Sequence, residues 1–281
     1  MQKLLKDLIY DVYARSGKNL DRYKNTHRGE DCYIIGDGTS IKWFDLKAFN
    51  DKPVFALCYL FFHRNFSDIG RPIYVPFNSP FYFYSHYKMT IPPYARWKNN
   101  IQNRYRQFIK QYHDAQFFVN LSNYPVLQGK NVNYFFKSIP GSELSDRCMS
   151  QNLTPFEGGF RAAIIMAVFM GFKKIYLVGC DYTHKNARAK HWYEFGPGIS
   201  IPDDGYNRDF LEIAEKYAEI ITITWEGEGR YLPSIEYEKY TKQVPVYKEN
   251  CDLIDMNDLF LLDTWPDYTI FPRVESLTES V

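Results

Sequence analysis

The stretch Glu157–His184, EGGFRAAIIMAVFMGFKKIYLVGCDYTH, determines the fold class that the sequence predicts. Ala, Ile, Met and Val residues follow two glycines and predict a buried helix that ends at Gly171. The apolar run Ile175–Val178 comes next and predicts a buried strand. Helices that alternate with short, continuously apolar strands are typical of a parallel sheet covered by helices on both faces.

Apolar runs elsewhere in the chain predict the remaining strands. These runs are 31–38, 52–62, 70–78, 115–122, 131–138 and 221–225, and a helical pattern over 206–220 precedes the last of them. We therefore predict an α/β fold, with a doubly wound, mainly parallel Rossmann-like sheet over residues 31–235. An amphipathic helix over 1–30 would precede this domain, a lid over about 81–113 would cover it, and an acidic extension over 236–281 would pack on it.

The composition is that of an ordinary globular protein except for its aromatic content. The chain has 281 residues, of which 45% are hydrophobic and 24% charged, while Phe, Trp and Tyr make up 18%. Part of this aromatic excess would line a cleft or a binding face, and an aromatic-rich core is the equal alternative. The net charge of +1 argues against a nucleic-acid partner, because nucleic-acid binders carry a basic excess.

The cysteines and the N-terminal residues indicate a cytoplasmic protein. The five cysteines are scattered through mostly apolar runs without the spacing of a metal site, which predicts reduced thiols in the core. The first twenty residues have an amphipathic, charged pattern and not that of a signal peptide. No run reaches the ~20 apolar residues of a membrane span, so we expect peripheral membrane contact at most.

Two segments have a biased charge. Residues 81–113 contain six Lys or Arg and no acidic residue, whereas residues 236–281 contain ten Asp or Glu against four Lys or Arg. A solvated face explains either bias. As a functional alternative, the basic and aromatic segment would be a lid over a sugar acceptor, because sugars stack on aromatic rings. Its cations would suit an anionic glycan, or a lipid-linked acceptor at the inner face of the membrane.

The first candidate site is the turn Gly36-Asp37-Gly38-Thr39-Ser40, directly after the first predicted strand. Open parallel sheets bind ligands at the carboxyl ends of their strands, where the strand order reverses. The glycines would let a phosphate approach the backbone, and free amides with the Thr39 and Ser40 hydroxyls would bind its oxygens. The turn is not a dinucleotide fingerprint, since Ile41 occupies the third glycine position. An ordinary glycine turn is the alternative.

Gly158 and Gly159 form the second candidate site at the start of the predicted buried helix. Their amides would point toward a ligand in the cleft. Glu157 would repel a phosphate there, so a sugar hydroxyl or a base is the expected ligand. Close packing of the helix against the sheet is the alternative explanation of the two glycines.

The third candidate site follows the strand Ile175–Val178. Asp181 would lie at its carboxyl edge, and His184 and His191 follow in the next loop. A carboxylate close to an imidazole is the arrangement that general-base catalysis of a hydroxyl attack requires. A metal site is the weaker alternative, because Asp-His-His lacks a fourth ligand nearby. For His184 alone, an exposed loop histidine is the simpler interpretation.

The segments YIIGDGTSIKWFD, FNSPFYFY and GGFRAAIIMAVFMGFKKIYLVGCDYT, in this order, resemble the bacterial sialyltransferases of lipooligosaccharide synthesis. They are similar also to wider relatives, the motility-accessory-factor glycosyltransferases and the hydroxymethylpterin pyrophosphokinase-like proteins. The resemblance implies a Rossmann-like sheet and a CMP-sialic acid donor. It further implies contacts to the CMP phosphate and ribose from Gly36, Gly38, Thr39, Ser40 and Asn78, and to the donor or cytosine from Gly158 and Gly159.

The chain departs from the sialyltransferase pattern at three places. Cys58 stands where an asparagine is expected, and Thr183 where a leaving-group tyrosine is expected. The catalytic histidine that precedes the second helix has no counterpart in ISIPDDGYNRDF. The base would then be Asp203, Asp204 or His191, and the spacing from Asp181 to His191 is more similar to that of the wider relatives.

The leading hypothesis is a glycosyltransferase that moves a CMP-activated ulosonic acid, of the sialic acid or Kdo type, to a glycan or glycolipid acceptor. A side-chain base would deprotonate the acceptor hydroxyl, which attacks the anomeric carbon with inversion as CMP leaves. Hydroxyls of Tyr182, Thr183 or Tyr193 and helix amides would stabilise the leaving phosphate. Because a CMP-sugar has a single phosphate, no metal or other cofactor is expected.

Two further classes stay open at this point. A Mg²⁺-dependent pyrophosphokinase-like transferase would need converging carboxylates, which Asp181, Asp203 and Asp204 would supply. A non-catalytic glycan-binding relative, which has kept the fold and lost the base, is the third class. A fold by itself does not decide among them.

Overall fold

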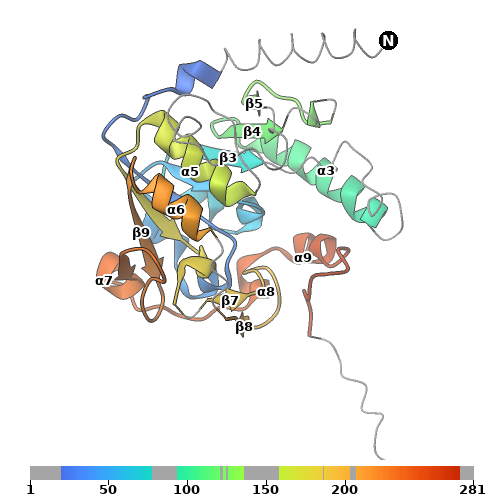
Figure 1. The fold of residues 1–281 in the computed structure, drawn as a ribbon. Coiled ribbons are helices and arrows are strands. Elements are labelled where there is room, and N and C mark those ends of the chain that lie inside the picture. The colour runs from blue at the N-terminus through green and yellow to red at the C-terminus, as the bar shows by residue number, and fades with distance from the viewer. Residues whose placement is uncertain are drawn as a thin grey trace, which may run out of the picture.

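The protein is described by a computed structural model that covers residues 20–77, 94–120, 123–124, 126–135, 158–185, 187–202 and 207–272. Within these residues an eight-stranded sheet forms the centre (Figure 1). Its strands are β1 (Asp31–Ile35), β2 (Val54–Ala56), β3 (Ile73–Phe77), β4 (Gln116–Asn120), β5 (Val132–Phe135), β6 (Lys174–Val178), β9 (Glu219–Thr224) and β10 (Ser234–Glu236). The strand order is β10-β9-β6-β1-β2-β3-β4-β5, and every pairing is parallel.

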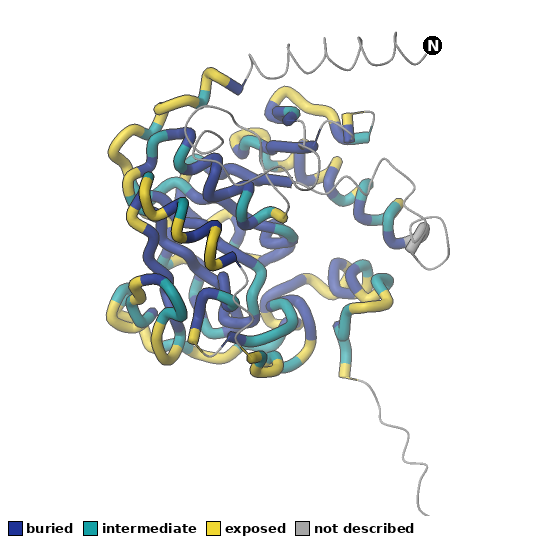
Figure 2. The backbone as a smooth tube through the Cα atoms, in the orientation of Figure 1, coloured by how far each residue is buried: buried dark blue, intermediate teal, exposed yellow. Residues whose placement is uncertain are grey.

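Helices cover both faces of the sheet, so the predicted doubly wound α/β fold is confirmed. On one face lie α5 (Gly159–Met170) and α6 (Arg208–Ala214), which pack into one core cluster with alternate side chains of the strands. The other face has its own core cluster, to which α3 (Tyr94–Gln111), α7 (Tyr237–Thr241), α8 (Asn250–Leu253) and α9 (Met256–Leu262) contribute. Figure 2 shows the buried strands at the centre and the exposed residues on the outer turns and helix faces.

The short elements of the structure are mostly 3-10 turns in the connections. These are η1 (Asp21–Tyr23), η2 (Thr39–Trp43), η3 (Leu46–Phe49), η4 (Leu60–Phe62), η5 (Phe66–Asp68) and η7 (Asp181–Thr183). A two-stranded antiparallel ribbon of β7 (Arg188–Ala189) and β8 (Ile199–Ser200) follows η7. The elements η2, η7 and this ribbon follow the carboxyl ends of β1 and β6.

The buried helix and the strand from which the fold class was predicted form as expected. Helix α5 ends at Gly171, whose φ of 87° places it in the left-handed region that favours glycine. The Gly171 amide donates to carbonyls of the last helical turn, and β6 starts three residues later. Strand β6 pairs with β1 on one side and with β9 on the other.

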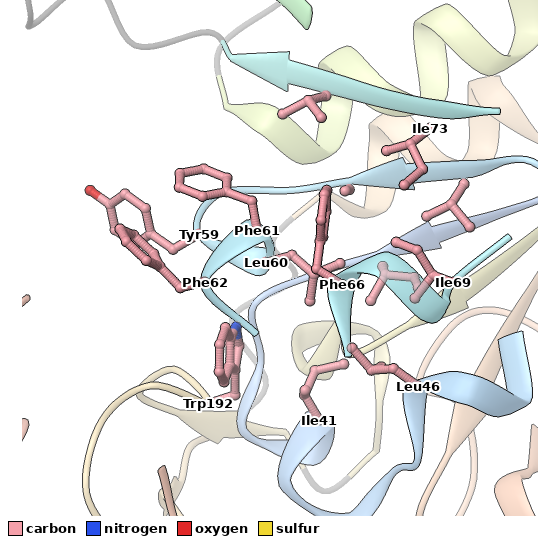
Figure 3. Close-up of a cluster of buried hydrophobic side chains, with 14 of the residues drawn as sticks. Ile41, Leu46, Tyr59, Leu60, Phe61, Phe62, Phe66, Ile69, Ile73 and Trp192 are labelled. Atoms are coloured by element: carbon pink, nitrogen blue, oxygen red, sulfur yellow. The ribbon is translucent and has the colours of Figure 1, made fainter. Parts of the chain in front are cut away.

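Two predicted elements are shorter in the structure. The apolar run 52–62 forms a strand only over Val54–Ala56, because Cys58 adopts a φ of 47° and turns the chain away from the sheet. The rings that follow pack as a cluster around η4, together with Phe66 and Trp192 (Figure 3). This cluster shows that much of the aromatic excess belongs to the core. Helix α6 ends at Ala214, and turns connect it to β9.

Part of the predicted lid belongs to the folded body. Helix α3 covers residues 94–111, and its stripe of Trp97, Ile101, Tyr105 and Phe108 is buried in the core. A spacing of three to four residues places these side chains on one face of the helix, which explains the burial. Residues 78–93, the other part of the basic segment, lie outside the described residues.

The ends of the chain differ from one another. Residues 1–19 lie outside the description, and η1 with the turns after it leads from there into β1. At the C-terminal end, α9 packs against α3, and Ile254, Leu259 and Leu262 are buried in the core. The acidic segment is therefore packed on the domain over 236–272. Within the ranges described, no helix combines the length and the apolar character needed to cross a membrane.

Candidate functional site

The order of the strands reverses between β1 and β6. From β1 the chain builds the sheet outward through β2, β3, β4 and β5, and it returns to the other side of β1 with β6. Two predicted sites, the glycine turn after β1 and the Asp181 loop after β6, therefore meet at this point, as expected for an open parallel sheet. Both loops leave the carboxyl ends of their strands.

The two loops bind directly to each other. The Asp181 carboxylate accepts hydrogen bonds from the Thr39 hydroxyl at 3.0 Å and from the Ser40 amide at 2.9 Å, and the Ser40 hydroxyl donates to it as well. Asp181 is 3% exposed. The donors proposed for a phosphate are thus engaged by a carboxylate of the protein itself. Phosphate contacts of Thr39 and Ser40 stay a prediction that requires Asp181 to release them.

The glycines of the turn allow this close approach. A Cβ on Gly36 would lie 2.5 Å from the Gly179 carbonyl oxygen, and a Cβ on Gly38 would lie 2.4 Å from Cγ of Asp181. The Gly38 amide donates to the Gly179 carbonyl at 2.8 Å. In this structure, the lack of a side chain at Gly36 and at Gly38 therefore allows the two loops to contact each other.

Tyr182 and Thr183 lie on opposite sides of the loop after β6. The Thr183 hydroxyl bonds to the Cys180 carbonyl at 2.7 Å and to the Thr222 hydroxyl at 2.8 Å, so it is directed into the sheet. The Tyr182 ring packs edge-on against Phe160, at the start of α5, with 5.0 Å between the ring centroids. Tyr182 is half-buried, and its ring lies next to the start of α5.

The second candidate site lies next to the ends of β2 and β3. Gly158 precedes α5 with a φ of 84°, and Gly159 is the first residue of the helix. A Cβ on Gly159 would come no closer than 3.9 Å to the Pro76 carbonyl, with Leu57 as the next neighbour. Close packing against the sheet therefore does not require glycine at 159.

The loop that carries His191 crosses the glycine turn. His191 and Gly38 form an isolated antiparallel bridge, and the Trp192 amide donates to the Asp37 carbonyl at 3.1 Å. Trp192 is completely buried in the aromatic cluster and fixes the loop there. The structure thus brings His191 to the first candidate site.

The His191 imidazole lies between two carboxylates. Its Nδ1 is 2.8 Å from Oε1 of Glu194, and its Nε2 is 3.6 Å from Oδ2 of Asp37. With Nδ1–H donating to Glu194, the neutral ring carries its lone pair on Nε2. The side chain is 36% exposed, and the ring stacks on Tyr193 with 4.8 Å between centroids.

The negative charges around His191 raise its pKa. Burial of the ring acts to lower the pKa of His191, but the carboxylates of Asp37 and Glu194 outweigh it and hold the pKa above its usual value. Burial acts to raise the pKa of Glu194, and hydrogen bonds from His191 and the Thr269 amide lower it below its usual value. The pair is therefore an imidazole oriented and made more basic by a carboxylate.

The acidic C-terminal segment completes the surroundings of this pair. The Thr269 amide donates to Oε2 of Glu194 at 3.0 Å, and the Phe195 amide donates to the Thr269 carbonyl at 2.7 Å. The Tyr268 ring lies edge-on to His191, at 5.6 Å between centroids. These contacts were not predictable from the sequence. Glu194 could have been noticed, because a carboxylate three residues after a histidine is within hydrogen-bond reach of it.

Cys58 also lies close to Asp37. It follows β2, is half-buried, and has the left-handed φ described above. Burial raises the pKa of the Cys58 thiol, and the nearby Asp37 carboxylate adds to the increase, so the thiol stays protonated. Asp37 is thus bordered by a thiol and an imidazole.

His184 is not the exposed loop histidine that the sequence predicted. It is 2% exposed, because the chain after η7 pairs with the loop before β10 through a bridge between His184 and Gly229. Burial lowers the pKa of His184 below its usual value, although Asp181 opposes this. His184 is therefore a core histidine, and it does not join His191.

The remaining predicted residues are not placed. Asn78, Asp203 and Asp204 lie outside the described residues, so their roles stay predictions. Among the residues that are described, no group of three or more His, Cys, Asp or Glu side chains is arranged to hold a metal ion.

The fold and this site define a class: a doubly wound α/β protein with a carboxylate–imidazole pair beside the point of strand-order reversal. Neither a protein-family model nor a curated protein sequence matches the chain. Solved structures similar to it are sialyltransferases of Campylobacter jejuni. Cst-I, a monofunctional alpha-2,3-sialyltransferase, shares 15% identity over 69% of this chain and 75% of its own, with a TM-score of 0.40.

A second enzyme from the same organism, the sialyltransferase CstII, shows the same degree of likeness. Its complex with cytidine-5'-monophosphate shares 15% identity over 88% of this chain and 96% of its own, with a TM-score of 0.41. Its complex with CMP-3FNeuAc shares 15% identity over 84% and 99%, with a TM-score of 0.43. These proteins are of the kind that the sequence motifs resemble.

Proposed function

We propose that this chain is a glycosyltransferase in which His191 is the general base. The observation that carries the proposal is the His191–Glu194 pair, with its partly exposed ring, beside the switch point of a parallel sheet. A base held by a second group in one orientation and one tautomer is the arrangement that activates a hydroxyl for attack. Asp181 is less suited to this role, because its carboxylate is buried and already accepts three hydrogen bonds.

The chemistry of the proposed step follows from the two ring nitrogens. Nε2 takes the proton of the acceptor hydroxyl while its oxygen attacks the anomeric carbon of the donor sugar. The bond between that carbon and the phosphate oxygen breaks, and its electron pair leaves with the nucleotide. Glu194 stabilises the imidazolium through Nδ1–H, as the raised pKa of His191 indicates.

The donor is, in this proposal, a CMP-activated ulosonic acid of the sialic acid or Kdo type. Support for CMP comes from the sequence motifs of the glycine turn and of the Gly158–Thr183 unit. Amides at the start of α5 would contact the donor, since the hydroxyls of Thr39 and Ser40 are engaged with Asp181. The acceptor hydroxyl would approach from the exposed side of His191, and a glycan or glycolipid would supply it.

The experiment is a donor-turnover assay on the full chain. CMP release from CMP-sialic acid and from CMP-Kdo is measured by chromatography, with and without an oligosaccharide acceptor. His191→Asn should lower turnover by about 10²-fold or more, the usual contribution of a general base. His113→Asn is the matched control, because His113 is exposed before β4, at the amino end of the sheet, and should turn over donor at the wild-type rate. Wild-type turnover by His191→Asn would remove His191 from the role of base.

The same assay separates the alternatives from the proposal. A Mg²⁺-dependent pyrophosphokinase-like enzyme would consume ATP and lose its activity in EDTA, whereas CMP-sugar turnover should be insensitive to EDTA. A glycan-binding protein without catalysis would release no CMP from any donor. A thermal-shift screen of CMP, UMP, UDP, GDP and ATP, each with and without Mg²⁺, gives the nucleotide preference directly, because a ligand of the folded state raises its melting temperature.

A further inference from the structure

Lys42 is a buried cation that the proposed chemistry does not use. It lies in η2, two residues after Ser40, and none of its side chain is exposed. Burying an ammonium group is costly unless each of its donors is satisfied. Burial lowers the pKa of Lys42, and the Glu249 carboxylate opposes this decrease. The groups that bind the Lys42 ammonium therefore indicate its role.

The Lys42 ammonium joins two segments that meet beside the glycine turn. It donates to the carbonyl of Glu194 at 2.6 Å and to the carbonyl of Gly196 at 2.8 Å, and it forms an ion pair with Glu249. Three donors therefore have three acceptors. Glu249 in turn accepts the Gly196 amide, with 3.2 Å to each carboxylate oxygen.

The backbones of these segments are fixed to each other as well. The Lys248 amide donates to the Lys42 carbonyl at 2.8 Å. Asn250, the next residue after Glu249, donates through Nδ2 to the Tyr193 carbonyl at 2.9 Å. Lys42 and the C-terminal segment thus both bind the backbone of the loop that carries His191 and Glu194.

One of the carbonyls bound by Lys42 belongs to Glu194, the residue that orients His191. The side chain of Glu194 accepts from the His191 amide at 3.0 Å and from Nδ1 at 2.8 Å. A buried ion pair adds little net stability over apolar residues of similar size. What Lys42 supplies is the geometry of the Glu194 backbone, and through it the place of the carboxylate against the imidazole.

We propose that Lys42 is a positioning residue for the His191–Glu194 pair. The inference rests on the proposed function for its catalytic consequence, and on the contacts alone for its effect on His191. Without the ammonium, the Glu194 carbonyl loses its donor, the loop shifts, and the carboxylate moves away from the ring. None of the Lys42 side chain is exposed, so its effect on His191 would pass through Glu194.

The test compares Lys42→Met, the double variant Lys42→Met/Glu249→Gln, and Lys47→Met as a control with an exposed lysine. The His191 pKa is measured by NMR titration, with His191→Asn to identify the resonance, and donor turnover gives kcat and KM. We expect the His191 pKa to decrease in both Lys42 variants. We also expect kcat to fall about tenfold or more, with the KM for donor unchanged. Lys47→Met should leave all three quantities unchanged.

The direction of the pKa change distinguishes positioning from simple electrostatics. Removing a nearby cation would by itself raise the His191 pKa, whereas loss of the Glu194 contact lowers it. The double variant carries no unpaired charge, so its folding does not depend on the ion pair. If it recovered the wild-type pKa and kcat, Lys42 would matter only as the counter-charge of Glu249, and the proposal would be overturned. A decreased pKa in a chain without donor turnover would retain the positioning role and refute the proposed function.

Discussion

Replacing Glu194 by glutamine tests how the charge of this carboxylate acts on His191. Glutamine has the same size, and its amide oxygen can still accept from the His191 amide and from Nδ1, which are 3.0 and 2.8 Å from Oε1 of Glu194. The substitution therefore removes the negative charge with little change of geometry. Because the carboxylates of Asp37 and Glu194 hold the His191 pKa above its usual value, the pKa should decrease in Glu194→Gln.

The size of the decrease follows from distance and exposure. Two unit charges about 4 Å apart interact by about 4 kcal/mol at an effective dielectric constant of ~20. The His191 side chain is 36% exposed, so solvent screens the pair, while Asp37 stays in place as the second carboxylate. A remaining effect of about 1–2 kcal/mol corresponds to a decrease of about one pKa unit.

The assay is a pH–rate profile of CMP release, together with NMR titration of His191. A general base acts in its neutral form, so turnover should rise with pH through the His191 pKa. In Glu194→Gln this rise should begin about one pH unit lower, and the plateau rate should decrease because a weaker base accepts the proton. Glu219→Gln, at the amino end of β9, removes the same charge far from the site and should leave the profile unchanged. A profile that is unchanged, or shifted to higher pH, in Glu194→Gln would refute the assignment of His191 as the base oriented by Glu194.

Two further predictions concern stability. Gly38→Ala should lower the free energy of unfolding in urea by about 1–3 kcal/mol, because its Cβ would overlap Asp181 and the Gly179 carbonyl. Gly159→Ala, whose Cβ has free space, should not lower it, and equal stability of both variants would contradict the packing argument. Burial lowers the pKa of His63 to about 4, so folded His63 stays neutral where the unfolded chain takes up a proton near pH 6.5. This contribution to the free energy of unfolding is present above about pH 6.5 and is lost as the pH falls toward about 4. Between pH 7 and about pH 4.5, the free energy of unfolding of His63→Phe should therefore decrease by about 2–3 kcal/mol less than that of the wild type. Equal decreases would show that His63 contributes nothing.

The strands were predictable because most are short and apolar on both sides. Cys32–Ile35 and Ile175–Val178 are buried on both faces of the sheet, and such runs differ clearly from the polar turns around them. The strand over 52–62 was too long in the prediction, because Tyr59–Phe62 is as apolar as a strand and packs as a turn. Apolar character reports burial, and it does not distinguish a buried strand from a buried 3-10 turn.

The candidate site was predictable only in its local parts. The glycine turn, Asp181 and His191 could be proposed as candidates because strand ends and residue chemistry are visible in the sequence. The hydrogen bonds from Thr39 and Ser40 to Asp181 were not predictable. These partners are 142 and 141 residues apart in the sequence, and they meet only because β6 pairs with β1. The burial of Lys42 was not predictable either, because it is produced by segments near residues 194 and 249. In the sequence, Lys42 resembles any lysine after a polar turn.

The contact between the loops after β1 and β6 limits where the proposed donor could bind. A ligand cannot enter between Gly38 and Asp181 while these loops contact each other, so under the proposed function the donor would bind beside β1 and β2. Asp37 and Cys58 follow those strands, and His191 of the crossing loop lies beside Asp37. The C-terminal segment contributes the Thr269 amide to Glu194 and the Tyr268 ring to His191. Segments from the beginning, middle and end of the chain are thus required to hold one imidazole, which explains why charge and motif alone did not reveal its partners.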